Sequence, residues 1–180
     1  IALTNTLNVG KVWDAMVDIV VEQCNQDGLE PMSINPVVGE CNDCRINQIQ
    51  KRAVGTAEVR RAFASASDDF EEGDVGAGAG TLCYGLKGGI GSASRVIRIG
   101  ETEYTIGVLV QSNFGATEDF WLNGEAVGAK ILDWKQEKDD MAASEEDKGS
   151  IMSILATDLP LTSRQLKRIL RRTGVGIART

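Results

Sequence analysis

Helical and strand-like segments lie in separate clusters along this chain and do not alternate strictly. Apolar residues recur at helical spacing over residues 9–25, and a second helix is expected over residues 56–70. Two strand-like runs, 95–99 and 104–111, follow each other around turn residues 100–101, which predicts a hairpin. Clustering of this kind favours a layered α+β fold over a doubly wound parallel sheet.

Polar residues that suit helix caps stand at the expected helix starts. Asn8 and Thr56 can cap the first two helices, and Thr162 or the serine after it can cap a last helix that ends near Gly174. The Asn-Gly pair in WLNGEAVG indicates another hairpin. The charged run 135–148 indicates an exposed loop.

The 180 residues contain no histidine. Histidine is the usual general base at neutral pH, so a Ser-His-Asp or Cys-His arrangement is impossible within these residues. A nucleophile in this chain would need a lysine, a carboxylate or an α-amine as its base.

Charge and hydropathy argue against two classes of partner. The net charge of −7 and the pI near 4.7 argue against a nucleic-acid binder, and no apolar stretch is long enough to predict a membrane span. The first residues do not resemble a signal peptide and lack an initiator Met, and they begin as if inside a strand. We therefore expect missing upstream sequence, and the cytoplasm is the favoured compartment.

Two patterns suggest cofactor chemistry only weakly. Cys41 and Cys44 form a C-x-x-C that suits a redox pair or half of a zinc site, but no second such motif exists, so two thiols in a turn are favoured. The GAGAG run 76–80 lacks the following Gly-Lys-Ser/Thr of a phosphate loop and the strand and acid of a dinucleotide site. We expect these glycines to serve close packing, and we expect no metal or cofactor.

The segment EEDKGSIMSILATDLP joins a charged run to an apolar one at Gly149 and Ser150. Ser150 could simply begin a buried strand, which is the favoured interpretation from local sequence. An N-terminal serine can also use its own α-amine as general base, which needs no histidine but requires cleavage of the preceding peptide bond. Gly149 suits such a cut because it lacks a Cβ that would obstruct attack.

Two further polar residues stand beside apolar segments. Asn113 ends the run IGVLVQSN, where its amide could stabilise an oxyanion, although Asn-x-Gly is also ordinary turn chemistry. Glu40 follows PVVG and could bind a substrate ammonium or be a solvated loop acid. Local sequence favours the turn residue and the solvated acid.

Four segments together resemble the self-cleaving L-aminopeptidase/D-esterase family, which includes the DmpA-like β-peptidyl aminopeptidases. They occur in the family's order and cover nearly the whole chain: IALTNTLNVGKVWDA, EGDVGAGAGTLCYGLKGGIGSASRV, IGVLVQSNFG and GSIMSILATDLPLTSRQLKRILRRTGVGIART. The resemblance implies an αββα sandwich of the N-terminal-nucleophile type and a serine aminopeptidase that processes itself.

The resemblance also implies roles for individual residues. The bond between Gly149 and Ser150 is the scissile bond, and Ser150 is the nucleophile. Asn113 matches the asparagine that supports the oxyanion, and Glu40 matches the acid that binds the free amine of a small peptide, aminoacyl amide or ester substrate. No metal or cofactor is implied.

The chain departs from the family pattern in two ways. Cys41 and Asn42 stand where the family has Thr-Tyr, so an aromatic hydroxyl is missing. The chain is also about half the family's length, so we expect one partial domain, incomplete at both ends, with 1–149 resembling the α-subunit and 150–180 the start of the β-subunit. Such a piece would expose sheet edges, and we expect a homo-oligomer.

Two other functions fit parts of the pattern. One is a self-cleaving acyltransferase of the ornithine acetyltransferase type, against which the serine rather than threonine at the junction argues. The other is a truncated, non-catalytic homologue that acts as an interaction subunit.

Overall fold

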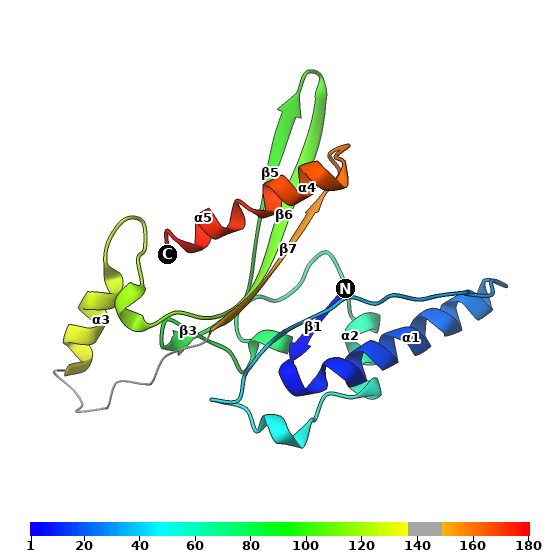
Figure 1. Ribbon diagram of the computed structural model, residues 1–180, viewed down its shortest axis with the longest axis horizontal. Coiled ribbons are helices and arrows are strands. Elements are labelled where there is room, and N and C mark those ends of the chain that lie inside the picture. Colours follow the sequence, from blue (N-terminus) through cyan, green and yellow to red (C-terminus); the bar gives the residue numbers. More distant parts are fainter. Residues whose placement is uncertain (137–148) are drawn as a thin grey trace.

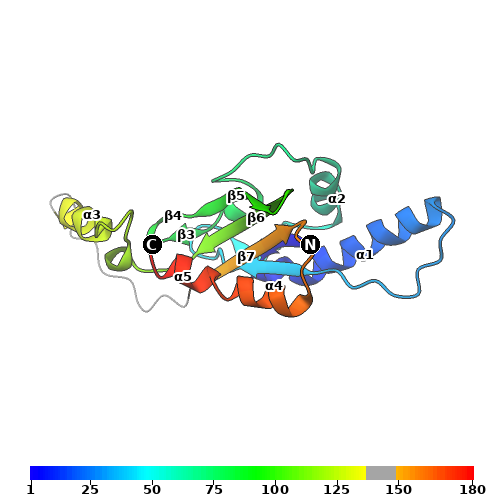
Figure 2. The ribbon, with the colours of Figure 1, turned by 90° about the horizontal axis from the view of Figure 1, so that it is seen from above.

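The computed structural model describes residues 1–136 and 149–180, which form layers in the order helix, sheet, sheet, helix (Figure 1, Figure 2). The helices are α1 Val9–Gln26, α2 Thr56–Ala64, α3 Val127–Gln136, α4 Ser163–Leu170 and α5 Thr173–Ile177. The strands are β1 Ala2–Asn5, β2 Val38–Cys41, β3 Leu82–Cys83, β4 Leu86–Lys87, β5 Gly89–Ile99, β6 Thr102–Asn113 and β7 Ser150–Thr157. This mixed α+β architecture confirms the predicted fold class.

The outer layer that contains α1 and α2 holds the main hydrophobic core. Val12, Ala15 and Ile19 on α1 pack against Val59 on α2, and all four side chains are buried. The parallel pair β1–β2 lies against α1, with Ala2 and Val38 contributing from the two strands. The apolar spacing that predicted the first helix therefore marks its buried face.

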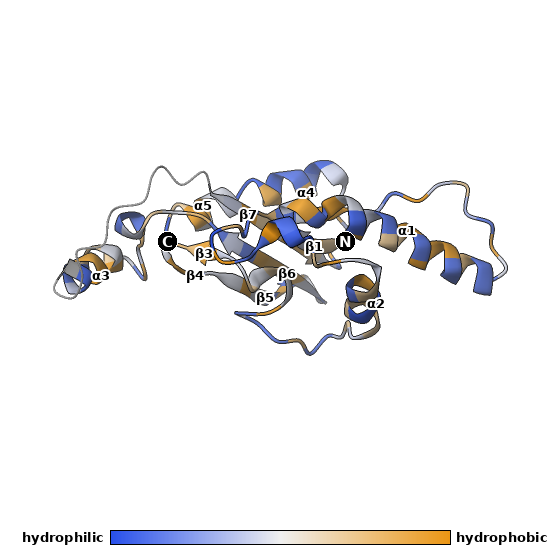
Figure 3. Cartoon of the chain, turned by 90° about the horizontal axis from the view of Figure 1, so that it is seen from below, coloured by the Kyte–Doolittle hydropathy of each residue, from blue (hydrophilic) through white to orange (hydrophobic). Residues whose placement is uncertain are grey.

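The three-stranded antiparallel sheet, in the order β5-β6-β7, presents different side chains on its two faces. Side chains alternate between faces along a strand. Met152 of β7 faces β2, because a Cβ built on Gly39 would lie 2.6 Å from its Cε. Ser150 shares this face, whereas Ile151 and Leu155 point to the opposite side, toward α4 and α5. Figure 3 shows that the apolar side of α4 turns toward the sheet and its charged side turns outward.

The predicted hairpin is confirmed, and its turn needs glycine at Gly100, where φ is 60°. The second helix was predicted too long, since it ends at Ala64 and not near Phe70. The residues after it are Ser-Ala-Ser-Asp-Asp, and the Ser67 hydroxyl donates to the carbonyl of Asp69. Such local side-chain bonds compete with helix formation.

The predicted helix caps were partly wrong. Asn8 precedes α1, but its amide donates to the side chain of Asn5 at 2.6 Å and does not cap the helix. Gly55 and not Thr56 precedes α2, where the Glu58 carboxylate accepts from the Gly55 N–H at 2.9 Å. Thr162 does cap α4, as predicted, with its hydroxyl accepting from the Gln165 N–H.

The WLNGEAVG segment forms the predicted Asn-Gly turn but not a hairpin. Asn123 and Gly124 have φ angles of 53° and 84°, yet a single bridge between Leu122 and Glu125 is the whole strand pairing around this turn. The chain enters α3 two residues later, so no room remains for a second strand. The start of the predicted loop 135–148 belongs to α3, and residues 137–148 lie outside the described part.

Within the described residues, no helix combines the length and hydropathy that crossing a membrane requires.

Candidate active site

Ser150 is the first residue of β7 and lies directly opposite Asn113, the last residue of β6. The hydroxyl of Ser150 accepts a hydrogen bond from the Asn113 amide at 3.0 Å. Antiparallel register therefore brings together two residues that are 37 positions apart in sequence. The half-buried serine lies on the sheet face that packs against β2.

The orientation of the Asn113 amide is fixed at both of its ends. The backbone N–H of Leu82 donates to Asn113 Oδ1 at 3.1 Å, and Asn113 Nδ2 also donates to the carbonyl of Asn42 at 3.0 Å. A backbone N–H can only donate, so the amide oxygen must face Leu82 and the NH₂ group must face Ser150. The turn interpretation of Asn113 is wrong, because the residue lies in β6 and the positive φ falls at Gly115.

Gly149 fits its place because it has no side chain. A Cβ at this position would lie 2.5 Å from Cα and 2.6 Å from Cβ of Phe114, and 3.1 Å from the carbonyl oxygen of Asn113. The Phe114 ring in turn makes an edge-to-face contact with Tyr84 at 5.2 Å, and Tyr84 stacks on Phe120 at 4.9 Å. Packing of the three aromatic rings thus fixes the position of Phe114, whose Cα and Cβ lie close to Gly149.

A Gly149→Ala change is expected to slow any cleavage at this bond by at least about tenfold, since the methyl group must displace backbone atoms of Phe114. The measurement is the first-order conversion of intact chain to fragments, followed by mass spectrometry. Gly174→Ala is a matched control, because its added methyl group would meet no neighbour within 4 Å. Equal rates for Gly149→Ala and the unaltered chain would contradict this steric account.

Glu40 occupies the third position of β2, in register with Thr4 of β1. The Thr6 hydroxyl donates to its carboxylate. Glu40 is half-buried and is followed by Cys41, the pKa of whose thiol is raised mainly by burial and further by the charge of Glu40. Glu40 thus lies in an ordered strand and has a side-chain partner, so the solvated-loop interpretation is wrong.

The C-x-x-C pair has two separate environments. Cys41 is fully buried at the end of β2, and burial raises the pKa of its thiol, whereas a hydrogen bond with Ser150 lowers this pKa by less. Cys44 is exposed, and its N–H donates to Asn42 Oδ1 at 3.1 Å in an Asx turn. Across the described residues, no three Cys, Asp or Glu side chains are grouped as they would be around a metal ion.

Gly78 and Gly80 of the glycine run serve close packing, as predicted. A Cβ on Gly78 would lie 2.7 Å from the Ile90 backbone nitrogen, and one on Gly80 would lie 2.7 Å from the Cβ of Asp43. Gly76–Gly78 forms one turn of 3₁₀ helix that contacts β5 and β6.

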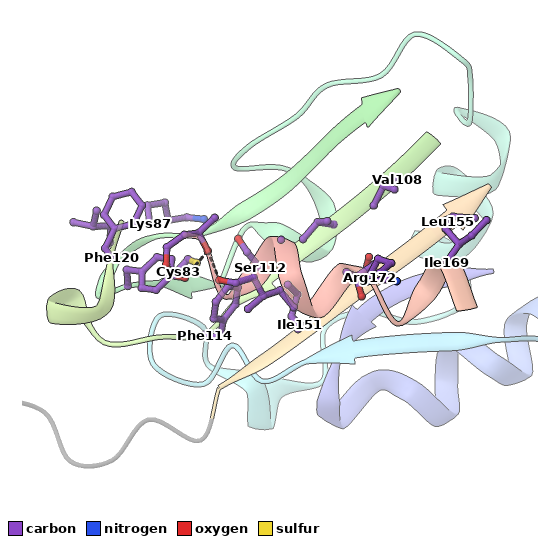
Figure 4. Close-up of a pocket in the computed structure, with 18 of the residues that line it drawn as sticks. Cys83, Lys87, Val108, Ser112, Phe114, Phe120, Ile151, Leu155, Ile169 and Arg172 are labelled. Carbon is purple, nitrogen blue, oxygen red and sulfur yellow. Dashed lines mark hydrogen bonds between the residues drawn. The ribbon is translucent and has the colours of Figure 1, made fainter. Parts of the chain in front are cut away.

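An apolar cavity of about 660 Å³ lies between the three-stranded sheet and the helices α4 and α5 (Figure 4). Ile151 and Leu155 line it from β7, and Ile169 and Arg172 lie across from them. This is the face opposite to Ser150, so the cavity is not where the serine hydroxyl points. The candidate active site is the junction of β2, β6 and β7.

Sequence reasoning missed three groups at this site: the Leu82 N–H, the Phe114 backbone and the Cys41 thiol. The first two act through main-chain atoms, which no residue pattern reveals. The position of Cys41 directly after Glu40 does indicate that it lies near the site. The C-x-x-C spacing, however, suggested only redox and metal chemistry.

The layer order and the serine at the head of a core strand, next to a glycine, define the N-terminal-nucleophile class of hydrolase folds. A solved structure from Ochrobactrum anthropi, an L-aminopeptidase D-Ala-esterase/amidase described as a variant of this fold, has a TM-score of 0.83 and 35% identity over 99% of this chain and 47% of that chain. A protein from Pyrococcus horikoshii has a TM-score of 0.85 and 44% identity over 99% of this chain and 47% of that one.

The chain belongs to peptidase family S58, whose model matches residues 1–180. It is 38% identical over 186 residues to beta-peptidyl aminopeptidase BapA from Sphingosinicella xenopeptidilytica, a match that covers 99% of this chain and 46% of that protein. The family resemblance read from the sequence is confirmed, and these matches do not favour the acyltransferase or the non-catalytic subunit. The chain spans about half the length of the relatives it matches.

Proposed function

We propose that this chain carries the processing junction and nucleophile of a serine aminopeptidase that activates itself by cutting the Gly149–Ser150 bond. The observation that carries the proposal is the Ser150 hydroxyl at the head of β7, 3.0 Å from the Asn113 amide, directly after a glycine that tolerates no side chain. Processing would separate an α-subunit part, 1–149, from a β-subunit part that begins at Ser150.

Processing would proceed as an acyl shift followed by hydrolysis. The Ser150 hydroxyl attacks the Gly149 carbonyl, the peptide C–N bond breaks, and the Gly149 acyl group becomes an ester on Oγ while the hydroxyl proton passes to the departing Ser150 nitrogen. Water hydrolyses this ester, which leaves a Gly149 carboxylate and a Ser150 residue with a free α-amine. That amine supplies the general base, a role that no histidine of these residues can take.

Substrate turnover would reuse the same groups. The Ser150 amine accepts the hydroxyl proton as Oγ attacks the substrate's first amide carbonyl, and the Asn113 N–H stabilises the oxyanion. The Glu40 carboxylate, held by the Thr6 hydroxyl, binds the substrate ammonium. Water then releases the acyl group, and no step uses a metal or cofactor.

The surroundings of Gly149 indicate which acyl residue would fit. In the proposed mechanism the Ser150 hydroxyl attacks two carbonyls, that of Gly149 during processing and that of the substrate during turnover. The space around the Gly149 Cα therefore approximates the space around the substrate carbon next to the scissile carbonyl. An L-side chain on that carbon would meet Phe114 at 2.5 Å. A β-amino-acid residue that carries its side chain next to the amine presents a CH₂ group there. We therefore propose a preference for β-amino-acyl over L-α-amino-acyl substrates, in line with the name of the Sphingosinicella relative.

Two readouts on the purified full-length protein test this function. Intact mass after storage is expected to show two fragments divided between Gly149 and Ser150. The mature protein is expected to hydrolyse a β³-homoalanyl anilide with at least about tenfold higher kcat/KM than the L-alanyl anilide, since a steric conflict of this kind costs more than about 1.4 kcal/mol. An uncut chain that releases no amine would contradict the function, and equal use of both anilides would contradict the substrate preference.

A further inference from the structure

Asp43 is the only acidic side chain that is buried in the described part of the chain, and the proposed mechanism gives it no role. It lies in the turn that follows β2, where its neighbours at 42 and 44–48 are all exposed. Its main-chain carbonyl accepts from the N–H groups of Ile46 and Asn47 at 3.2 and 2.9 Å, so the turn closes on this residue. Asp43 is therefore the point at which an exposed turn is fixed to the rest of the fold.

One carboxylate oxygen of Asp43 joins the turn to β1. Asp43 Oδ2 accepts from the Asn5 amide at 3.2 Å and from the Asn47 amide at 2.8 Å. Asn5 is itself buried, and its Oδ1 accepts from the Asn8 amide at 2.6 Å. An ionised carboxylate only accepts, so Asn5 must present its NH₂ group to Asp43 and its oxygen to Asn8. The network thus has one arrangement of donors and acceptors.

The glycine run packs against the same side chain. A Cβ on Gly80 would lie 2.7 Å from the Cβ and 2.8 Å from Oδ2 of Asp43, so the main chain there leaves the carboxylate little room to move. The other carboxylate oxygen, Oδ1, is buried and has no hydrogen-bond partner in the described structure, which costs stability. Stability alone therefore does not explain a carboxylate at this position.

The turn fixed by Asp43 carries a carbonyl that the candidate active site uses. The Asn42 main-chain carbonyl, which is bonded to the Asp43 nitrogen, accepts from the Asn113 amide at 3.0 Å. The same amide donates to Ser150 Oγ at 3.0 Å. An amide nitrogen has two hydrogens in a fixed plane, so the carbonyl that accepts one of them sets the direction of the other. A displacement of Asp43 would therefore move the group that orients the Asn113 donor.

We propose that Asp43 is a positioning residue that acts through Asn113. Its carboxylate holds the Asn42 carbonyl in place, and this carbonyl directs the remaining N–H of Asn113 toward the nucleophile and the oxyanion. The inference rests on the proposed function and adds a residue to it. Asp43 acts on the oxyanion donor, which leaves the Ser150 O–H free to pass its proton to the α-amine.

The first test measures Gly149–Ser150 cleavage at pH 7 in folded, full-length Asp43→Ala and Asp43→Asn proteins. Alanine removes both hydrogen bonds to Oδ2, and the rate is expected to fall at least about tenfold, because a slightly misplaced catalytic group is costly. Asparagine retains an oxygen that can accept both bonds, so its rate is expected to stay within about threefold of the unaltered rate. In mature enzyme the alanine loss should fall on kcat and leave KM nearly unchanged.

A double-mutant cycle separates positioning from a merely structural role. If Asp43 acts through the Asn113 amide, then adding Asp43→Ala to Asn113→Ala should slow cleavage by less than about twofold further, since the positioned donor is already absent. Val59→Ala is the control for stability. It removes buried side-chain volume between α1 and α2, so it should lower the melting temperature and leave the cleavage rate and kcat of the folded protein unchanged.

Cleavage by Asp43→Ala at the unaltered rate would overturn the positioning role. The same loss with and without the Asn113 side chain would overturn it too, as would equal losses in the alanine and asparagine variants. If Asp43→Ala prevents folding, the cycle is run with Asn47→Ala, which removes one hydrogen bond at an exposed position and should slow cleavage about threefold. No slowing in Asn47→Ala would then count against the role, whereas failure of the unaltered protein to cleave would overturn the proposed function instead.

Discussion

A Ser150→Ala protein is expected to remain a single uncut chain and to release no amine from aminoacyl substrates. The change removes the only atom proposed to attack the Gly149 carbonyl, and it also prevents the Ser150 α-amine from being freed, so processing and turnover are lost together. Loss of a nucleophile of this kind lowers kcat by about 10⁶-fold in a well-studied serine protease. Denaturing gels and intact mass over several days give the readout.

Ser153→Ala is the matched control for that experiment. Ser153 is three residues further along β7, lines the cavity under α4 and α5, and has a buried hydroxyl that lacks a hydrogen-bond partner within the described structure. Its removal should leave cleavage unchanged and should not destabilise the fold, since no satisfied hydrogen bond is broken. Fragments divided at Gly149 in the Ser150→Ala protein would show that another group makes the cut.

Sequence periodicity was sufficient for the elements that bury one clear face. Residues 9–25 repeat apolar side chains at helical spacing, and the structure places α1 there, ending one residue later. The runs on either side of Gly100 needed only a turn that permits positive φ, and the hairpin followed. These are cases in which local propensity and tertiary packing agree.

Predictions for polar residues were wrong where the side chain has a hydrogen-bond partner that is brought to it by the fold. Asn8 has the right identity and position for a cap, yet its amide is fully buried and bonds to Asn5. Glu40 resembles a solvated acid until the 3₁₀ turn after β1 brings the Thr6 hydroxyl to it. Local residue preferences give the most frequent role of an asparagine or a glutamate, but they contain no information about hydrogen-bond partners from other parts of the fold.

The pairing at the site is a consequence of register, which local sequence does not encode. Asn113 and Ser150 meet because β6 and β7 are antiparallel and aligned so that the end of one strand faces the start of the other. A shift of one residue would turn Ser150 to the opposite face, toward α4 and α5. The family resemblance identified both residues, whereas their local contexts favoured a strand start and a turn.

Asn113→Ala is expected to lower both the cleavage rate and the kcat of the mature enzyme by about 10²–10³-fold, the usual cost of losing one oxyanion donor. KM should change little, because the developing oxyanion exists only in the transition state. Asn113→Asp should lose as much, since a carboxylate can still accept from the Leu82 N–H but cannot donate to Ser150 or to an oxyanion. The measurements are single-turnover processing rates and steady-state kinetics with a β-aminoacyl anilide.

The Asn42→Ala variant distinguishes the role of the Asn113 amide donor from that of the Asx turn at Asn42, whose carbonyl accepts from this amide. The Asn42 side chain accepts from the Cys44 N–H, while the contact with Asn113 uses the Asn42 main-chain carbonyl, which alanine retains. The Asn42→Ala protein should therefore process and turn over at nearly the unaltered rate. If Asn42→Ala is as slow as Asn113→Ala, then the geometry of the turn after Glu40, and not the donor on Asn113, limits the chemistry. If Asn113→Asp is as fast as the unaltered protein, then Asn113 does not stabilise the oxyanion, and that donor must be sought in main-chain N–H groups near Leu82.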